Sequence, residues 1–469
     1  MGYLLMLIPL VALVIMNLLP ARVRIKSAIG LAITVCLAQI IMVLIHPTGF
    51  WDRLIIAGLE PIFEFNLQIS GLGLIMMLTA GLVSLSAILV AAAVWRQEFE
   101  LLNFASLLMI ALIGMNGIAM VNGLFQLYIF IEVTALSTFV LICLRRDRLA
   151  FEGVWKYLLL SVVASVLMLA AVGLCLIFAP DNTFVALRQT IPLAAGSFLP
   201  RAAMGLFLAG LLIKSGAVPF HGWLPDAYQS APAPVAVLLA GIITKASGVF
   251  ALIRLVAEVT GPVPVANILL LTGALSVVIG ALAALGQTDI KRMLAYSSIS
   301  QVGYIILALG AGTRLGLLAA MFHFFNHAVA KSQLFANAAA LEEKTGSTDL
   351  NKISGLGGRM PVTGVTMLIG SLSTAGLPPL AGFWSKLAVV MALWFAGQYV
   401  YAVIAILASV LTLAYFLLLQ RKLFFNKVSP EMGGVKEASA LLLTPAVGLS
   451  VITVVLGVAL PLYWLMGGR

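Results

Sequence analysis

Long apolar runs, separated by short polar connections, dominate the chain. Each run has about 18 to 25 residues, enough to cross the roughly 30 Å hydrocarbon core of a bilayer as a helix. The runs lack the ten-residue alternation that is typical of outer-membrane barrel strands. The pattern therefore predicts an all-α integral membrane protein with about fourteen transmembrane helices, over residues 3–20, 27–46, 71–94, 103–120, 122–144, 156–179, 202–224, 233–257, 265–286, 292–311, 314–340, 361–395, 397–420 and 438–466.

Two of the expected helices contain prolines that should break them. Pro219 lies in the helix over 202–224, and Pro378 and Pro379 lie in the helix over 361–395. Proline removes a backbone donor and clashes with the preceding turn. Paired interrupted helices in two halves of a chain are typical of inverted-repeat transporters. The spacing predicts one transmembrane domain over 1–469, with three N-terminal helices in 1–102, a five-helix repeat over 103–257, an inverted repeat over 265–420 and a C-terminal helix over 438–466.

Composition agrees with this class. Hydrophobic residues make up 62% of the chain, charged residues make up 9%, and the mean hydropathy is +1.14, which excludes an ordinary soluble domain. The first run has no basic residue before it and no small-residue cleavage site after it, so we expect a helix and not a signal peptide. Cys36, Cys143 and Cys175 are too widely spaced for a metal or iron–sulfur motif. We therefore expect no cofactor in this chain.

The net charge is +10, and the basic residues are unevenly divided between the two sides of the membrane. If the loop after the first helix is cytoplasmic, most basic residues collect on the cytoplasmic side, as the positive-inside rule requires. Both termini then lie on the other side of a prokaryotic-type inner membrane. No run of basic residues lies within a soluble domain, so the positive charge does not indicate nucleic-acid binding.

Five ionisable side chains interrupt the apolar runs. A charge at the bilayer centre costs about 2.5 to 3.5 kcal/mol on insertion-based scales, and such residues usually mark an ion or proton path. Burial favours the neutral form of an isolated carboxylic acid or lysine, whereas pairing holds both groups charged. The pattern predicts such a path through Glu132, Lys214, Lys245, His327 and Lys386.

Short motifs surround these residues. They are FIE (130–132), KSGAVPFHGWLPDAY (214–228), APAPV (231–235), GIITK (241–245), QTDIKRMLAYSS (287–298), HFFNH (323–327) and GLPPLAGFWSK (376–386). Together they resemble the antiporter-like subunits shared by respiratory complex I, membrane-bound nickel–iron hydrogenases, formate hydrogenlyases and Mrp sodium/proton antiporters. No long lateral helix follows the predicted bundle, which favours the Mrp D subunit or a middle complex I subunit.

The resemblance implies a role for each intramembrane residue. Glu132 resembles the invariant acid of the family, and Lys214 resembles its lysine partner. Lys245 resembles the central proton carrier, which His327 would connect to Lys386, a position held by lysine or glutamate in the family. The resemblance implies an ion-translocating, proton-pumping subunit of a complex I-like oxidoreductase or membrane-bound hydrogenase. Its partners would be other membrane subunits and protons or Na⁺, with no catalytic redox site in this chain.

Other interpretations stay open. The subunit could belong to an Mrp antiporter without redox chemistry, or its polar residues could be inert and only fix helix packing. His323 and Lys331 share a helix face with His327 and are candidates for the path, although His323 is equally suited to a structural hydrogen bond. His221 and Asp226 are candidates for cytoplasmic proton uptake, but the proline-rich segment around them is equally explained by folding.

Overall fold

Helices make up nearly all of the chain that the computed structural model describes, namely residues 2–45, 67, 69–95, 97–193, 197–260, 265–428 and 432–465. In chain order, with η for π-helical turns, they are α1 (Gly2–Leu18), α2 (Ala21–Ile45), α3 (Gly71–Val94), α4 (Glu98–Met120), α5 (Leu124–Cys143), α6 (Arg148–Phe178), α7 (Phe184–Leu193), α8 (Phe198–Lys214), α9 (Trp223–Ser230), α10 (Ala233–Leu238), η3 (Leu239–Ile243), η4 (Lys245–Phe250), α11 (Ala251–Arg254), η5 (Leu255–Thr260), α12 (Ala266–Leu285), α13 (Ile290–Gly310), α14 (Arg314–Thr345), α15 (Pro361–Ala375), α16 (Ala381–Phe395), α17 (Tyr399–Gln420), η7 (Arg421–Phe425) and α18 (Ala440–Leu465).

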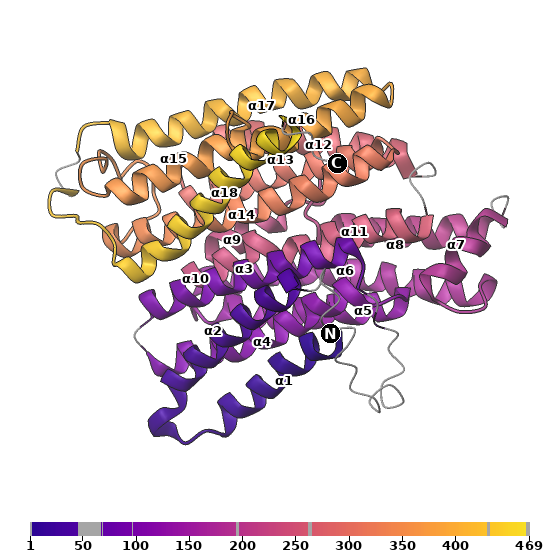
Figure 1. Cartoon of the computed structure of the whole chain (residues 1–469), viewed down its shortest axis with the longest axis horizontal. Coiled ribbons are helices and arrows are strands. Elements are labelled where there is room, and N and C mark those ends of the chain that lie inside the picture. Colours follow the sequence, from indigo (N-terminus) through magenta and orange to yellow (C-terminus); the bar gives the residue numbers. More distant parts are fainter. Residues whose placement is uncertain are drawn as a thin grey trace.

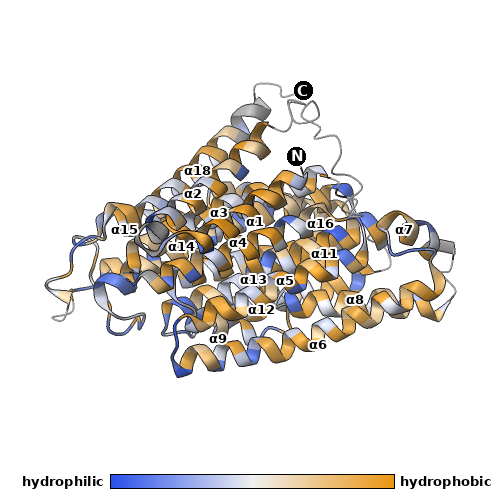
Figure 2. Ribbon diagram, turned by 90° about the horizontal axis from the view of Figure 1, so that it is seen from below, coloured by the Kyte–Doolittle hydropathy of each residue, from blue (hydrophilic) through white to orange (hydrophobic). Residues whose placement is uncertain are grey.

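The helices form one bundle in which early and late parts of the chain lie at opposite edges. The indigo helices α1 and α2 lie along one edge of Figure 1 and the orange helix α17 lies along the other, whereas the yellow helix α18 crosses the bundle and packs against α14 and α3. Hydrophilic residues gather at helix ends and in connecting segments, whereas the outer helix α6 is largely hydrophobic (Figure 2).

Ten helical segments of the described residues are long and apolar enough to cross a membrane. This confirms the predicted all-α membrane class, while the number of about fourteen crossings stays a prediction. The polar helix α14 is not among the ten, although it has 32 residues, because His323, Asn326, His327 and Lys331 interrupt it. The expected helix ends at residues 46 and 466 lie outside the described residues.

Some boundaries differ from the prediction. α6 begins at Arg148 and not near residue 156, because the Asp147 side chain caps it by accepting a hydrogen bond from the Ala150 N–H at 2.8 Å. A carboxylate at this position satisfies one of the unpaired N–H groups at the start of a helix. The short helix α7 and the π-helical turns between α10 and Thr260 were not predicted.

Both predicted helix breaks are confirmed. Pro219 lies between α8 and α9, and Pro378 and Pro379 lie between α15 and α16, where a missing backbone donor costs no intrahelical bond. Each break contains a glycine with positive φ, Gly216 at 67° and Gly376 at 89°. Because side chains rarely adopt this conformation, glycine ends both α8 and α15.

The centre of the bundle is formed by residues 233–260 and by most of α14. Every residue of the most apolar window of 233–260 is buried within the chain. This segment packs directly on the end of α8, since a Cβ on Gly248 would lie 2.3 Å from the Ser215 nitrogen. The close approach brings η4, which begins at Lys245, beside the first helix break.

Candidate functional site

An ion pair joins α5 to the end of α8. The Nζ of Lys214, the last residue of α8, lies 3.0 Å from Glu132 Oε1. Two serines of α6 complete the site: Lys214 donates to Ser161 Oγ at 2.6 Å, and Ser165 Oγ donates to Glu132 Oε1 at 2.6 Å. The Lys214 side chain is 0% exposed, whereas that of Glu132 is 24% exposed. The carboxylate therefore extends from a buried cation to the surface of this chain.

Lys245 stands at the start of the π-helical turn η4 and is buried. Its Nζ donates to the backbone carbonyl of Ala240, one turn earlier. None of the ion pairs found in the described ranges involves Lys245. A buried ammonium without a carboxylate is costly, so this lysine is suited to exchanging a proton.

Helix α14 presents three buried side chains, His323, His327 and Lys331, at four-residue spacing. Residues four apart lie on one face of a helix. Lys331 Nζ contacts α13, where it donates to the Leu294 carbonyl at 3.0 Å and to Ser297 Oγ. The sequence left open whether Lys331 belongs to the path. Lys331 lies on the same face of α14 as His327.

His327 occupies the middle of this group. Neither of its ring nitrogens has a hydrogen-bond partner among the described residues. Its imidazole lies within electrostatic reach of Lys245, Lys331, His323 and Lys386. The structure therefore brings three of the predicted path residues, Lys245, His327 and Lys386, into one buried cluster.

Lys386 lies in the second turn of α16, just after the second helix break. Its Nζ is 3.3 Å from the Ala375 carbonyl and 4.5 Å from the centre of the Tyr304 ring. An aromatic face attracts a cation. His323 borders the same ring at 5.6 Å between centroids and lies 3.0 Å from Ser385 Oγ through Nδ1. Hydrogen bonding and relay membership are thus both compatible with the position of His323.

His221 and Asp226 lie apart from this cluster. Asp226 on α9 contacts Lys156 at 2.8 Å and Arg292 at 2.6 Å, beside a cavity of about 220 Å³ that Glu152 also lines. The Asp226 carboxylate thereby joins α6, α9 and α13 and is already neutralised by two cations. His221 belongs to the segment of the first break, and its buried Nδ1 has no partner among the described residues.

Sequence reasoning missed Ser161, Ser165 and Tyr304. The serines were recognisable in principle, because their four-residue spacing places them on one face of a helix. Tyr304 had no such signal, since only the packing of α13 against α16 brings its ring under Lys386.

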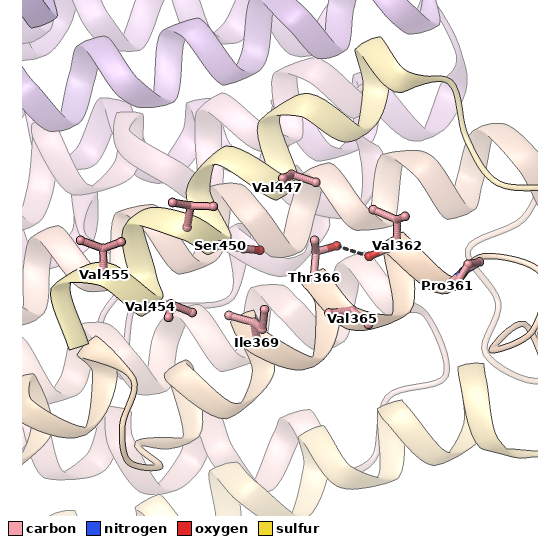
Figure 3. A pocket seen from close by; sticks show the side chains of 10 residues that line it. Pro361, Val362, Val365, Thr366, Ile369, Val447, Ser450, Val454 and Val455 are labelled. Carbon is pink, nitrogen blue, oxygen red and sulfur yellow. Dashed lines mark hydrogen bonds between the residues drawn. The ribbon is translucent and has the colours of Figure 1, made fainter. Parts of the chain in front are cut away.

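The polar axis is the series Glu132, Lys214, Lys245, His327 and Lys386. A groove between α15 and α18 is not part of it (Figure 3). Its lining is almost entirely aliphatic. The Ser450 hydroxyl in it donates to the Ala446 carbonyl and accepts from Gln333, so both its donor and an acceptor position already have partners within the chain. This groove of about 540 Å³ is unsuited to ion passage.

The sequence of this chain is similar to that of known proteins. Residues 121–412 match the family described as "NADH:quinone oxidoreductase/Mrp antiporter, TM". The matched region contains all five of the predicted path residues. The chain belongs to this family.

Relatives from different complexes are similar to this antiporter-like chain. It is 35% identical over 325 residues to the N subunit of the NADH-quinone oxidoreductase of Desulforudis audaxviator, with coverage of 68% of this chain and 64% of that one. It is 31% identical over 392 residues to the D subunit of the Na⁺/H⁺ antiporter of Alkalihalophilus pseudofirmus, with coverage of 82% and 78%.

A solved structure has the same fold over nearly the full length. A chain of the membrane-bound sulfane sulfur reductase, an archaeal respiratory membrane complex, superposes with a TM-score of 0.86 at 27% identity, with coverage of 99% of this chain and 95% of that one. The predicted membership of the antiporter-like family is thus confirmed.

Proposed function

We propose that this protein moves protons through the membrane along the buried polar axis. The observation that carries the proposal is the cluster of Lys245, His327 and Lys386, three ionisable groups buried together with no ion pair to a carboxylate in the described ranges. Groups of this kind are expensive in a membrane unless they bind or pass ions. Lysine and histidine exchange protons directly, whereas a bare cluster of cations repels Na⁺.

The Glu132–Lys214 pair is proposed as the switch of the path. Its carboxylate reaches the surface of the chain, where a neighbouring subunit can contact it. When Glu132 is drawn away, Lys214 loses its counter-ion, and the free energy of a charged lysine in the protein rises. The resulting change in charge is transmitted through Lys245 and His327 to Lys386. Lys386 then accepts and releases the transported proton.

The wider setting is part of the proposal, and the names of the relatives support it. We infer that a neighbouring subunit of a complex I-like oxidoreductase or membrane-bound hydrogenase supplies the driving reaction, and that this chain holds no cofactor of its own. The inferred membrane is a prokaryotic-type inner membrane, with both termini on the non-cytoplasmic side. The inverted repeats over 103–257 and 265–420 are part of the proposal and are supported by the two similar helix breaks.

A second candidate is an Mrp-type antiporter without redox chemistry, favoured by the similarity to the D subunit of a Na⁺/H⁺ antiporter. The two candidates differ in what drives transport. Flux that requires an electron donor indicates the oxidoreductase setting, whereas flux driven by a Na⁺ gradient alone indicates the antiporter.

The deciding experiment replaces Lys245 in the whole complex and measures proton flux in sealed vesicles. Lys245→Met keeps the length of the side chain and removes the charge, so the complex should assemble while flux falls by about 100-fold or more, the usual range for losing a proton-transfer group. Lys291→Met is the matched control, because Lys291 is also buried but is paired with Glu342 at 2.6 Å, away from the cluster. Full flux in Lys245→Met would refute the path, and failure of assembly in Lys245→Met alone would support a structural role.

A further inference from the structure

Helices α13 and α14 run antiparallel and contact each other at two defined levels. At one level Lys331 Nζ donates to Ser297 Oγ. At the other level the rings of Tyr304 and His323 lie 5.6 Å apart. As the residue number rises along α13 it falls along α14, so the two contacts fix the register of the pair.

Gln301 lies between these two levels and opposite His327. It follows Ser297 by four residues on α13, and His327 precedes Lys331 by four residues on α14. Because residues four apart share a helix face, both side chains lie one turn from the Lys331–Ser297 contact. The register therefore places the Gln301 amide at the height of the His327 imidazole.

Both side chains are buried with unpaired polar atoms. Gln301 is 1% exposed and His327 is 2% exposed. The Nε2 and Oε1 atoms of Gln301 and both ring nitrogens of His327 form no hydrogen bond of normal geometry with the described residues. A buried polar atom without a partner costs about 1–3 kcal/mol, and buried water is the usual partner where protein atoms supply none.

A third buried polar group, on α17, lies at the same level. The Tyr415 hydroxyl lies beside Ser297, Gln301 and Thr412, yet it too forms no hydrogen bond of normal geometry with the described residues. Three helices thus place buried polar atoms at the level of Gln301, and water satisfies such donors and acceptors at the same time.

We propose that Gln301 is a positioning residue that holds water between His327 and the Lys331–Ser297 contact. An amide donates and accepts at the same time but does not ionise, so it orders water without trapping the proton. A proton crosses such water when one O–H bond forms as the next one breaks, and the mobile proton is the only species transferred. Lys331 is thereby connected to the path by water. This inference rests on the proposed function, since it assigns a part of the same proton path.

The test uses three variants of the intact complex. Gln301→Met keeps chain length and volume but removes the donor and the acceptor, and we expect proton flux to fall about tenfold or more, equivalent to about 1.4 kcal/mol in the barrier. Gln301→Asn keeps the amide and should recover most of the flux, since water fills the space of the missing methylene. Gln39→Met is the matched control, because Gln39 is an equally buried glutamine on α2 that is bonded to Asn116.

A structural readout accompanies the flux measurement. A high-resolution map of the unmodified complex should show water within hydrogen-bond distance of the Gln301 amide and His327, and this water should be lost in Gln301→Met. Normal flux in Gln301→Met, or a dry site in the unmodified complex, would overturn the role of Gln301. If Lys245→Met also pumps normally, the proposed proton path itself fails, and the water density then reports only on local hydration.

Discussion

The two helix breaks of this chain are built alike but treat their lysines differently. Each has a glycine with positive φ followed by proline, and each has a buried lysine nearby. Lys214 precedes its break and is paired with Glu132 at 3.0 Å. Lys386 follows its break and contacts the Tyr304 ring and the Ala375 carbonyl, with no ion pair found in the described ranges.

The difference separates two tasks that a buried lysine can perform. A carboxylate at hydrogen-bond distance stabilises the ammonium form and ties it to the position of its partner. An aromatic face and a carbonyl stabilise the ammonium less, so its proton is more easily released. The first break is thus suited to sensing the movement of a charge and the second to exchanging a proton.

Removing the carboxylate of the first break should have the largest effect. In Glu132→Gln, Lys214 keeps its burial but loses its counter-ion, and we expect flux through the intact complex to fall by about 100-fold or more. Glu132→Asp keeps the charge on a shorter side chain and should do much less harm. Equal losses in the two variants would show that packing and not charge matters at this position.

Replacing the lysine of the second break should lower flux without lowering stability. Lys386→Met removes an unpaired buried charge, so the complex should unfold at the same temperature or higher while flux falls by about 100-fold or more. Lys386→Glu keeps an ionisable group and should retain part of the flux. If Lys386→Met pumps normally, the second break has no part in proton exchange.

The ion pairs of Asp226 should affect stability and not transport. Asp226→Asn leaves Lys156 and Arg292 without their shared carboxylate, and because all three side chains are partly exposed, we expect a loss of about 1 kcal/mol in the free energy of unfolding. Thermal unfolding and flux should be measured on the same sample. A large loss of flux at normal stability would restore Asp226 as a proton uptake site.

The smallest effect is expected from Tyr304→Phe. The variant loses the hydrogen bond from the hydroxyl to the Ala405 carbonyl, at 2.7 Å, which contributes about 1 kcal/mol to stability. It keeps the ring beneath Lys386, so flux should stay unchanged. Tyr304→Leu removes the ring as well and should reduce flux below that of Tyr304→Phe; equal flux in both would exclude a role for the aromatic face.

The sequence was sufficient for the features that depend on local chemistry. Long apolar runs predicted the membrane class, and Pro219, Pro378 and Pro379 predicted the two breaks, because proline acts within its own helix. The pairing of Glu132 with Lys214 came from the family resemblance, and the coordinates agree with it.

Features that depend on the register between helices could not be predicted from the sequence. The ring of Tyr304 under Lys386 and the level of Gln301 opposite His327 require the packing of α13 against α14 and α16. The π-helical turn that begins at Lys245, which packs against the first break, was not predicted from the sequence either. The proton-uptake role of Asp226 stays a prediction, and its ion pairs with Lys156 and Arg292 could not be predicted from the sequence because they join three helices.

The most direct test of a single path through both breaks is a double-variant measurement of proton flux. Glu132→Asp and Lys386→Glu each keep an ionisable group and should leave measurable flux, whereas an arginine at 386 would stay protonated. Each single variant is compared with the double variant in the same vesicles. If the two groups act in series on one path, the double variant should pump at about the rate of the slower single variant, since coupled sites are not additive. Losses that multiply in the double variant would contradict the account, because independent sites combine in that way.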